Sequence, residues 1–189
     1  MDFIYNTVIK KIKKNPLHKL YLEYVIYNKC VMRILNIANK VRWRKINLIV
    51  ILWPPAAEFF DEITMELECS VKIQKKRNFQ IKDGVFHDFV RELYIIDNAG
   101  PDKISKKLER LSERPHKLLV LNIEIQRPNL LVQDALNTVR CENVGNIKDN
   151  IRKKFKAKLD RYVYDIIIHS TEVDYQNKKV MSLIEKYKS

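Results

Sequence analysis

A chain of 189 residues is long enough for one domain with a sizeable core, with or without a helical extension, but it is cramped for two domains. With 46% apolar residues, three glycines and six prolines, the composition is typical of a folded globular protein and excludes a low-complexity chain. A net charge of +13 repels itself unless an anionic partner, such as nucleotide, nucleic acid or an acidic membrane, compensates it. A coding sequence biased toward Lys, Ile and Asn would produce the same charge without a partner.

The three cysteines, Cys30, Cys69 and Cys141, are widely spaced and form neither a CxxC pair nor a zinc-binding pattern. We therefore expect reduced thiols and no metal site in the protein itself. No N-terminal stretch has the uninterrupted apolar segment of a signal peptide, and the longest apolar runs are too short to span a bilayer. These features predict a basic cytoplasmic protein without a transmembrane segment.

Residues 1–45 are predicted to be helical, with a break at Asn15-Pro16 because proline disfavours helical geometry in the residue before it. Six apolar residues of the second helix share one face, since they recur at spacings of three, four or seven: Leu17, Tyr21, Tyr24, Val31, Leu35 and Ala38. The many lysines and arginines of this segment either coat a solvated face or lie against phosphate or anionic lipid. We expect a basic N-terminal extension over 1–45 that docks on a partner or on a second copy of the chain.

The pattern changes at Ile46, where a β-branched run that stops at Trp53-Pro54-Pro55 predicts a buried strand. The elements predicted after it are a helix from Pro55 to Glu68, a basic strand over 69–79, a helix from Phe86 to about Asp97, a helix opened by Pro101, a central strand Lys117–Ile125, a helix from Glu142 to about Leu159, a strand Tyr162–His169 and a terminal helix. Residues 128–141 fit either a helix or an ordered loop.

The order of these elements over 46–189 is β-α-β-α-β-α-β-α, which predicts one α/β domain. A ferredoxin-like α+β fold, with a four-stranded sheet and flanking helices, accommodates this order. The alternative is a doubly wound parallel sheet, whose ligands bind at the carboxyl ends of strands. Either topology makes the segment after Ile168 a candidate site.

No Walker-type glycine loop, GxGxxG, GxSxG or HExxH motif is present, which excludes most motif-based enzyme assignments. The remaining candidate is His169, which stands where an apolar strand ends, just before two hydroxyls and the carboxylate of Glu172. Its imidazole can serve as a proton shuttle, metal ligand or nucleophile, oriented by Glu172 or Asp165. Alternatively, His169 is a hydrogen-bonded strand-end residue, and Ser170 and Thr171 cap the last helix.

Three short segments resemble nucleoside diphosphate kinases. Ile167-Ile168-His169-Ser170-Thr171-Glu172 resembles that family's I-I-H-G-S-D, in which the histidine is the phosphorylated nucleophile. Ile151-Arg152-Lys153-Lys154-Phe155 is similar to its I-R-G-D-F, whose arginine contacts nucleotide phosphate, and Leu93-Tyr94-Ile95-Ile96-Asp97 is similar to its H-Y-I-D-L, whose tyrosine lies near the active site. The resemblance covers about residues 46–187. It departs from the family at Trp53, where the family has a lysine, at Ser170, where it has a glycine, and near Val180, where its glutamate has no counterpart.

The resemblance implies a ferredoxin-like fold and a nucleotide- or phosphate-binding protein, and its expected activity is that of a phosphotransferase that uses His169 with Glu172. It implies phosphates held beside His169 by Arg152 and Arg140, a nucleotide site completed by Tyr94 and Thr171, and a nucleoside triphosphate with Mg²⁺ as the cofactor.

A hypothesis of a different class is a nucleic-acid-binding or ribonucleoprotein component without catalysis. It would neutralise phosphates with the N-terminal helices and with four basic residues of the second strand, Lys72, Lys75, Lys76 and Arg77. In both hypotheses the ligand is anionic.

Overall fold

The computed structural model describes residues 45–97, 101–111, 115–133, 138–160, 162 and 165–189, together with 26–27, 29–34 and 37 of the N-terminal part. A four-stranded antiparallel sheet forms the centre, from β1 (Lys45–Leu52), β2 (Lys72–Gln80), β3 (Lys117–Gln126) and β6 (Ile168–Ser170). The strand order is β2-β3-β1-β6, and every pairing is antiparallel. This is the order of the split βαβ arrangement, so the ferredoxin-like fold is confirmed and the parallel doubly wound alternative is wrong.

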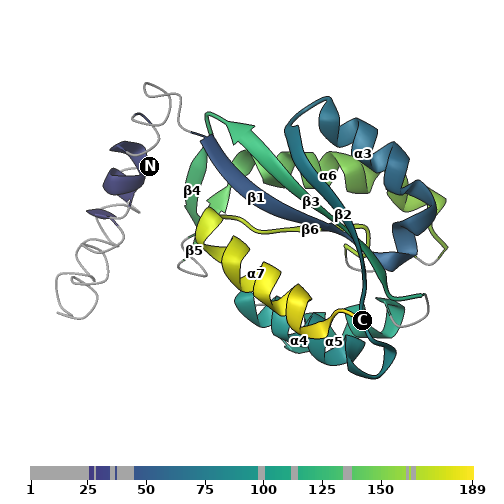
Figure 1. Cartoon of the computed structure of the whole chain (residues 1–189). Helices are drawn as coiled ribbons and strands as arrows, with labels where there is room; N and C mark the ends of the chain where they lie inside the picture. Colours follow the sequence, from purple (N-terminus) through teal and green to yellow (C-terminus); the bar gives the residue numbers. More distant parts are fainter. Residues whose placement is uncertain are drawn as a thin grey trace, which may run out of the picture.

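Helices cover both faces of the sheet, as Figure 1 shows. One face carries η1 (Pro54–Phe59), α3 (Phe60–Glu68) and α6 (Glu142–Phe155), and the other carries α4 (Phe86–Ile96), α5 (Pro101–Leu111) and α7 (Asp174–Tyr187). The short turns η2 (Asp83–Val85) and η3 (Lys156–Lys158) complete the helical elements that the described core contains.

Alternate residues of β1 enter two separate apolar clusters. Leu48, Val50 and Leu52 pack with the layer of α3 and α6, whereas Ile49 and Ile51 pack with the layer of α4, α5 and α7. Because both sides of this strand are covered, its sequence is a continuous apolar run and not an alternating one. The predicted strand is therefore confirmed together with its burial.

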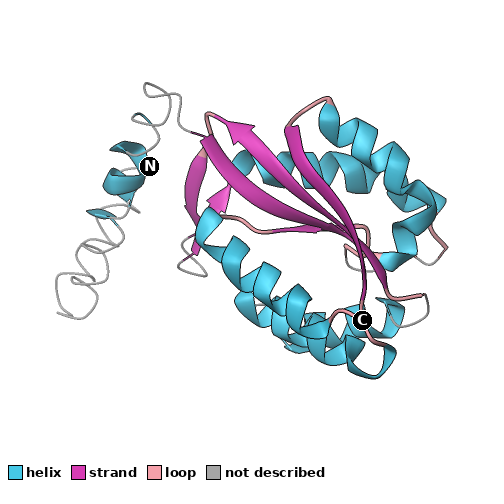
Figure 2. Ribbon diagram, in the orientation of Figure 1, coloured by secondary structure: helices cyan, strands magenta, loops and turns pink. Residues whose placement is uncertain are grey.

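The described residues of the ambiguous segment 128–141 do not follow the helix or the ordered loop that the sequence suggested. Two strands, β4 (Leu130–Gln133) and β5 (Thr138–Cys141), pair as an antiparallel hairpin, shown in magenta beside the main sheet in Figure 2. Asn129 fixes the start of this hairpin to α6, because its N–H donates to Asn143 Oδ1 at 2.7 Å and its carbonyl accepts from the N–H of Glu142 at 2.9 Å.

The last strand is shorter than predicted. The sequence suggested a strand from Tyr162 to His169, but β6 begins only at Ile168. Asp165 has a φ of 54°, a left-handed conformation that is incompatible with a β-strand. Non-glycine residues rarely adopt this conformation. Pairing with β1 resumes just after it, where the N–H of Trp53 donates to the carbonyl of Ile167 at 3.0 Å.

The basic second strand lies at an edge of the sheet. Most of β2 is exposed, including Lys72, Lys75, Lys76 and Arg77. Charged side chains on an edge strand disfavour pairing with another chain. This arrangement gives the basic residues a structural role that needs no ligand.

Most of the predicted N-terminal extension, including Leu17, Tyr21, Tyr24, Leu35 and Ala38, lies outside the described residues. The described positions 26–27, 29–34 and 37 are helical. Within the part of the chain that the structure describes, no helix is both long and apolar enough to cross a bilayer.

Candidate functional site

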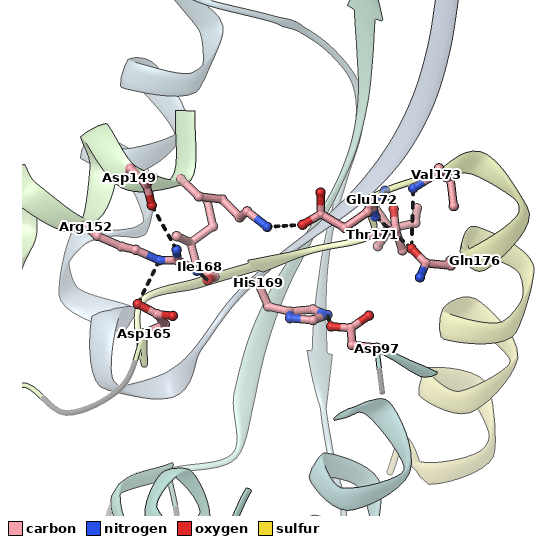
Figure 3. A network of polar contacts seen from close by, with 12 residues as sticks. Asp97, Asp149, Arg152, Asp165, Ile168, His169, Thr171, Glu172, Val173 and Gln176 are labelled. Atoms are coloured by element: carbon pink, nitrogen blue, oxygen red, sulfur yellow. Dashed lines mark hydrogen bonds and ion pairs between the residues drawn. The ribbon is translucent and has the colours of Figure 1, made fainter. Parts of the chain in front are cut away.

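His169 is the middle residue of β6, and its imidazole points toward the layer of α4, α5 and α7. Figure 3 shows the ring directed from the strand toward Asp97. The ring centroid lies 5.3 Å from that of Tyr94 and 6.2 Å from that of Trp53, and 8% of the side chain is exposed. The imidazole is therefore buried beside the rings of Tyr94 and Trp53, on the strand at one edge of the sheet.

Asp97 is the carboxylate that faces this imidazole. Its Oδ2 lies 3.5 Å from His169 Nε2, and it follows directly after α4, where its own N–H donates to the carbonyl of Tyr94. A carboxylate beside one ring nitrogen fixes the orientation of the ring and favours a proton on that nitrogen. The sequence pointed to Glu172 or Asp165 for this role. Asp97 comes from an element distant in the chain, so only the fold brings it to His169.

A buried lysine lies beside Tyr94 on the same side of the sheet. Lys107 of α5 donates to Tyr94 Oη at 2.6 Å, its Nζ lies 4.3 Å from the centre of the Tyr94 ring, and both side chains are buried. Sequence reasoning missed Lys107, although its spacing from Ile104, Leu108 and Leu111 places it on the inner face of the helix. A charged residue on an apolar face was the signal that could have identified it.

Burial and nearby charges shift the pKa of the Tyr94 hydroxyl. Burial raises the pKa of Tyr94 strongly, the negative charges of Asp97 and Asp165 raise it further, and the positive charge of Arg152 opposes them. The phenol thus stays protonated at neutral pH.

Arg152 of α6 is brought to the backbone that precedes His169. Its Nη2 donates to the carbonyl of Ile168 at 3.2 Å, its Nε lies 3.3 Å from Asp165 Oδ1, and its Nη1 donates to Asp149 at 3.2 Å. Figure 3 shows these contacts on the far side of β6 from the imidazole. The arginine therefore holds the left-handed turn at Asp165 in place and contacts the backbone next to His169, and none of these contacts is with the imidazole ring.

Arg140 takes no part in this cluster. It lies on β5, and its guanidinium packs against Gly145 in the first half of α6, where a Cβ would collide with it. Within the described ranges, no hydrogen bond or ion pair joins Arg140 to His169, Tyr94 or Arg152.

Glu172 points away from His169 and forms an ion pair with Lys148 of α6 (Figure 3). Its N–H and that of Val173 donate to Oε1 of Gln176, at 2.7 and 3.4 Å. The start of α7 is thus capped by Gln176, and not by Ser170 or Thr171 as the alternative interpretation expected. The structure does not bring Glu172 and the imidazole together.

Thr171 connects β6 to β1 and α7. Its hydroxyl accepts from the N–H of Ile49 at 2.9 Å and donates to Asn177 Oδ1 at 2.7 Å, while its own N–H donates to the carbonyl of Ile49 at 2.9 Å. Asn177 in turn donates to the carbonyl of Asn47 at 2.6 Å. The two bonds of the Thr171 hydroxyl are buried or partly buried, whereas the Asn177–Asn47 bond is exposed, and together they fix the position of β6 along β1.

No protein-family model matches the sequence, and no curated protein matches it. Among solved structures, the chain is similar to the nucleoside diphosphate kinase of Aquifex aeolicus, with 15% identity over 75% of this chain and 95% of that chain and a TM-score of 0.48. It is also similar to a nucleoside diphosphate kinase family protein from Babesia bovis, with 12% identity, coverage of 76% and 91% and a TM-score of 0.41.

A third similar structure is the nucleoside diphosphate kinase of Borrelia burgdorferi, solved with vanadate and ADP, with 7% identity, coverage of 74% and 86% and a TM-score of 0.41. The strand order, and not these superpositions, defines the fold as ferredoxin-like.

Stability at high pH reports on Tyr94. The folded state keeps the phenolic proton well above pH 10.0, the ordinary pKa, whereas the unfolded state releases it there. The unfolded state then binds fewer protons, so the free energy of unfolding falls as the pH rises above about 10, by up to about 1.4 kcal/mol per pH unit for this group. Urea unfolding of Tyr94→Phe should show a shallower fall than the wild type, and the exposed Tyr175→Phe should not. Equal slopes for all three proteins would contradict the buried protonated phenol.

Removal of the Thr171 hydroxyl should destabilise the fold. Thr171→Val leaves the buried N–H of Ile49 without its side-chain acceptor, which we expect to cost about 2 kcal/mol in urea unfolding. Thr171→Ser retains the hydroxyl and should recover most of this loss, while Ser182→Ala on the exposed side of α7 should change stability by less than about 0.5 kcal/mol. An unchanged unfolding midpoint in Thr171→Val would show that the hydroxyl is not structural.

Proposed function

We propose that the chain is a nucleotide-binding protein in which His169 acts as a phosphate acceptor. The observation that carries this proposal is the pairing of His169 Nε2 with Asp97 Oδ2 at 3.5 Å. A carboxylate beside the imidazole stabilises the positive ring formed on attack. In this reaction a ring nitrogen of His169 bonds to the terminal phosphorus of a nucleoside triphosphate, the bond to the bridging oxygen breaks, and the diphosphate leaves.

Phosphoryl transfer depends mainly on positioning and on cations that neutralise the phosphate oxygens. Lys107 and Arg152 are the cations of this cluster, and Lys107 lies on the same side of the sheet as the imidazole. Trp53 occupies the position at which the kinase family has a lysine. We infer that Lys107, which reaches Tyr94 from α5, supplies the positive charge that Trp53 lacks.

The proposed Mg²⁺ would arrive with the nucleotide. Among the described residues, no group of three His, Cys, Asp or Glu side chains is arranged to hold a metal ion. Protein-bound Mg²⁺ commonly uses one or two carboxylates together with substrate phosphates, and Asp97 and Asp165 are the carboxylates of this cluster. The residues thus fit a metal shared with the phosphates better than a metal held by the protein alone.

We further propose that residues 46–189 constitute the nucleotide-binding domain, that residues 1–45 form a separate extension, and that the protein acts in the cytoplasm. Assembly through the extension, as a homo-oligomer or as a subunit of a complex, is part of the same proposal.

Incubation with ATP labelled in the γ-phosphate tests the acceptor. We expect an acid-labile, base-stable label on the wild type, none on His169→Ala, and a rate reduced at least about tenfold in Asp97→Asn, which keeps the shape but loses the charge. His87→Ala, at an exposed position of α4, is the matched control and should label as the wild type does. No label on the wild type, or equal labelling of His169→Ala, would remove the nucleophile role.

Nucleic-acid binding remains the second candidate, because Lys72, Lys75 and Arg77 line the exposed edge strand. Lys75 and Arg77 also border a small cavity of about 120 Å³ next to Met181 of α7. If these two side chains contact phosphates, Lys75→Glu/Arg77→Glu should weaken RNA binding. The slope of the logarithm of the RNA association constant against the logarithm of the salt concentration should also fall, by the amount expected for the loss of about two phosphate contacts. Lys178→Glu/Lys179→Glu makes the same charge change on α7 and should have a smaller effect. Equal effects of the two pairs would indicate that only net charge matters.

A further inference from the structure

The positive charge of the protein is concentrated at one end of the chain. Residues 1–45 contain eleven lysines and arginines but only two acidic residues, whereas residues 46–189 contain 25 and 21. A compositional bias toward lysine would spread the excess of basic over acidic residues along the whole chain, whereas most of this excess lies in residues 1–45. The anionic partner that the net charge calls for is therefore to be sought at the N-terminal segment.

The same segment exposes large apolar side chains. In its described helical positions, Ile26, Tyr27, Ile34 and Ile37 are 54, 67, 65 and 63% exposed. The other exposed large apolar residues of the described chain, Met65, Ile95, Leu131 and Tyr175, lie one each on α3, α4, β4 and α7. Single exposed apolar residues are ordinary, but a group of them on one short segment marks an interaction surface.

Basic residues alternate with these apolar residues. Lys29 and Arg33 are four positions apart, so they lie one above the other on one side of the helix. A ligand for this segment has to accept both the cations and the bulky aliphatic side chains. The possible partners differ in whether they can accept both kinds of side chain.

Nucleic acid compensates the cations but offers little to three isoleucines. A second copy of the same segment covers the apolar residues but adds its own excess of nine positive charges, which opposes close approach. An anionic lipid surface satisfies both, because headgroup phosphates attract the cations while apolar side chains enter the boundary with the acyl chains.

We propose that residues 26–37 bind peripherally to an anionic membrane. Ile26, Tyr27, Ile34 and Ile37 enter the interface, and Lys29 and Arg33 pair with lipid headgroups. The α/β domain is then held at the membrane surface by its N-terminal arm. This proposal does not depend on the proposed chemistry of His169.

Flotation of the full chain with lipid vesicles tests this proposal. We expect the wild type to float with vesicles of phosphatidylcholine and phosphatidylserine, at least about tenfold more tightly than with vesicles of phosphatidylcholine alone, and to be released in part by salt. Failure to float with the anionic vesicles, or equal binding to both kinds, would overturn the proposal.

Charged replacements in the arm separate membrane insertion from simple charge attraction. Ile34→Asp/Ile37→Asp should reduce vesicle binding at least about tenfold, and Lys29→Gln/Arg33→Gln should reduce binding to anionic vesicles in particular. Ile95→Asp is the matched control, because Ile95 is 61% exposed on α4, and it should bind as the wild type does. All variants should retain the urea unfolding midpoint of the domain.

Two further outcomes would overturn the proposal in favour of another partner. The first is wild-type vesicle binding by Ile34→Asp/Ile37→Asp combined with loss of RNA binding in Lys29→Gln/Arg33→Gln. The second is a concentration-dependent oligomer of the wild type without lipid that Ile34→Asp/Ile37→Asp dissociates.

Discussion

The pairing of β6 with β1 is the contact on which the candidate site depends. β6 has three residues, so its own backbone bonds to β1 are few, and the Thr171 hydroxyl adds a further bond to Ile49 while it also binds Asn177 of α7. A shift of this short strand by one residue would turn His169 to the opposite face of the sheet. The bonds at Thr171 oppose that shift, and they therefore set which helical layer the imidazole meets.

That layer decides the chemistry of the imidazole. On the side of α4 and α5 the ring meets Trp53, Tyr94 and Asp97, with Lys107 behind Tyr94. On the side of α6 it would instead have met the Lys148–Glu172 pair. Because the two faces carry separate sets of charged groups, an acidic residue next to the histidine in sequence is a poor guide to its partner in space.

The periodicity of the sequence predicted most of the fold, because buried apolar positions repeat at the helical or strand spacing whatever the partner. It failed at β6, whose start is set by the left-handed Asp165, and at the paired strands β4 and β5, whose apolar residues fit several conformations. Of the site, the sequence indicated His169, Tyr94 and Arg152 through local segments. It could not indicate the contact with Asp97, since that pairing depends on where α4 ends relative to β6.

Arg152 is already compensated inside the domain, and this limits how a phosphate can bind near His169. Arg152 is held by Asp149 and Asp165, so a phosphate that takes its guanidinium must replace a carboxylate, and the gain in free energy is only the difference between two ion pairs. Lys107 donates to the phenol of Tyr94, and a phosphate that replaced this acceptor would form a charge-assisted bond in place of one to a neutral oxygen. On the imidazole side of the sheet the proposed phosphate contact is therefore Lys107, and Arg152 acts mainly by holding the turn at Asp165 that precedes β6.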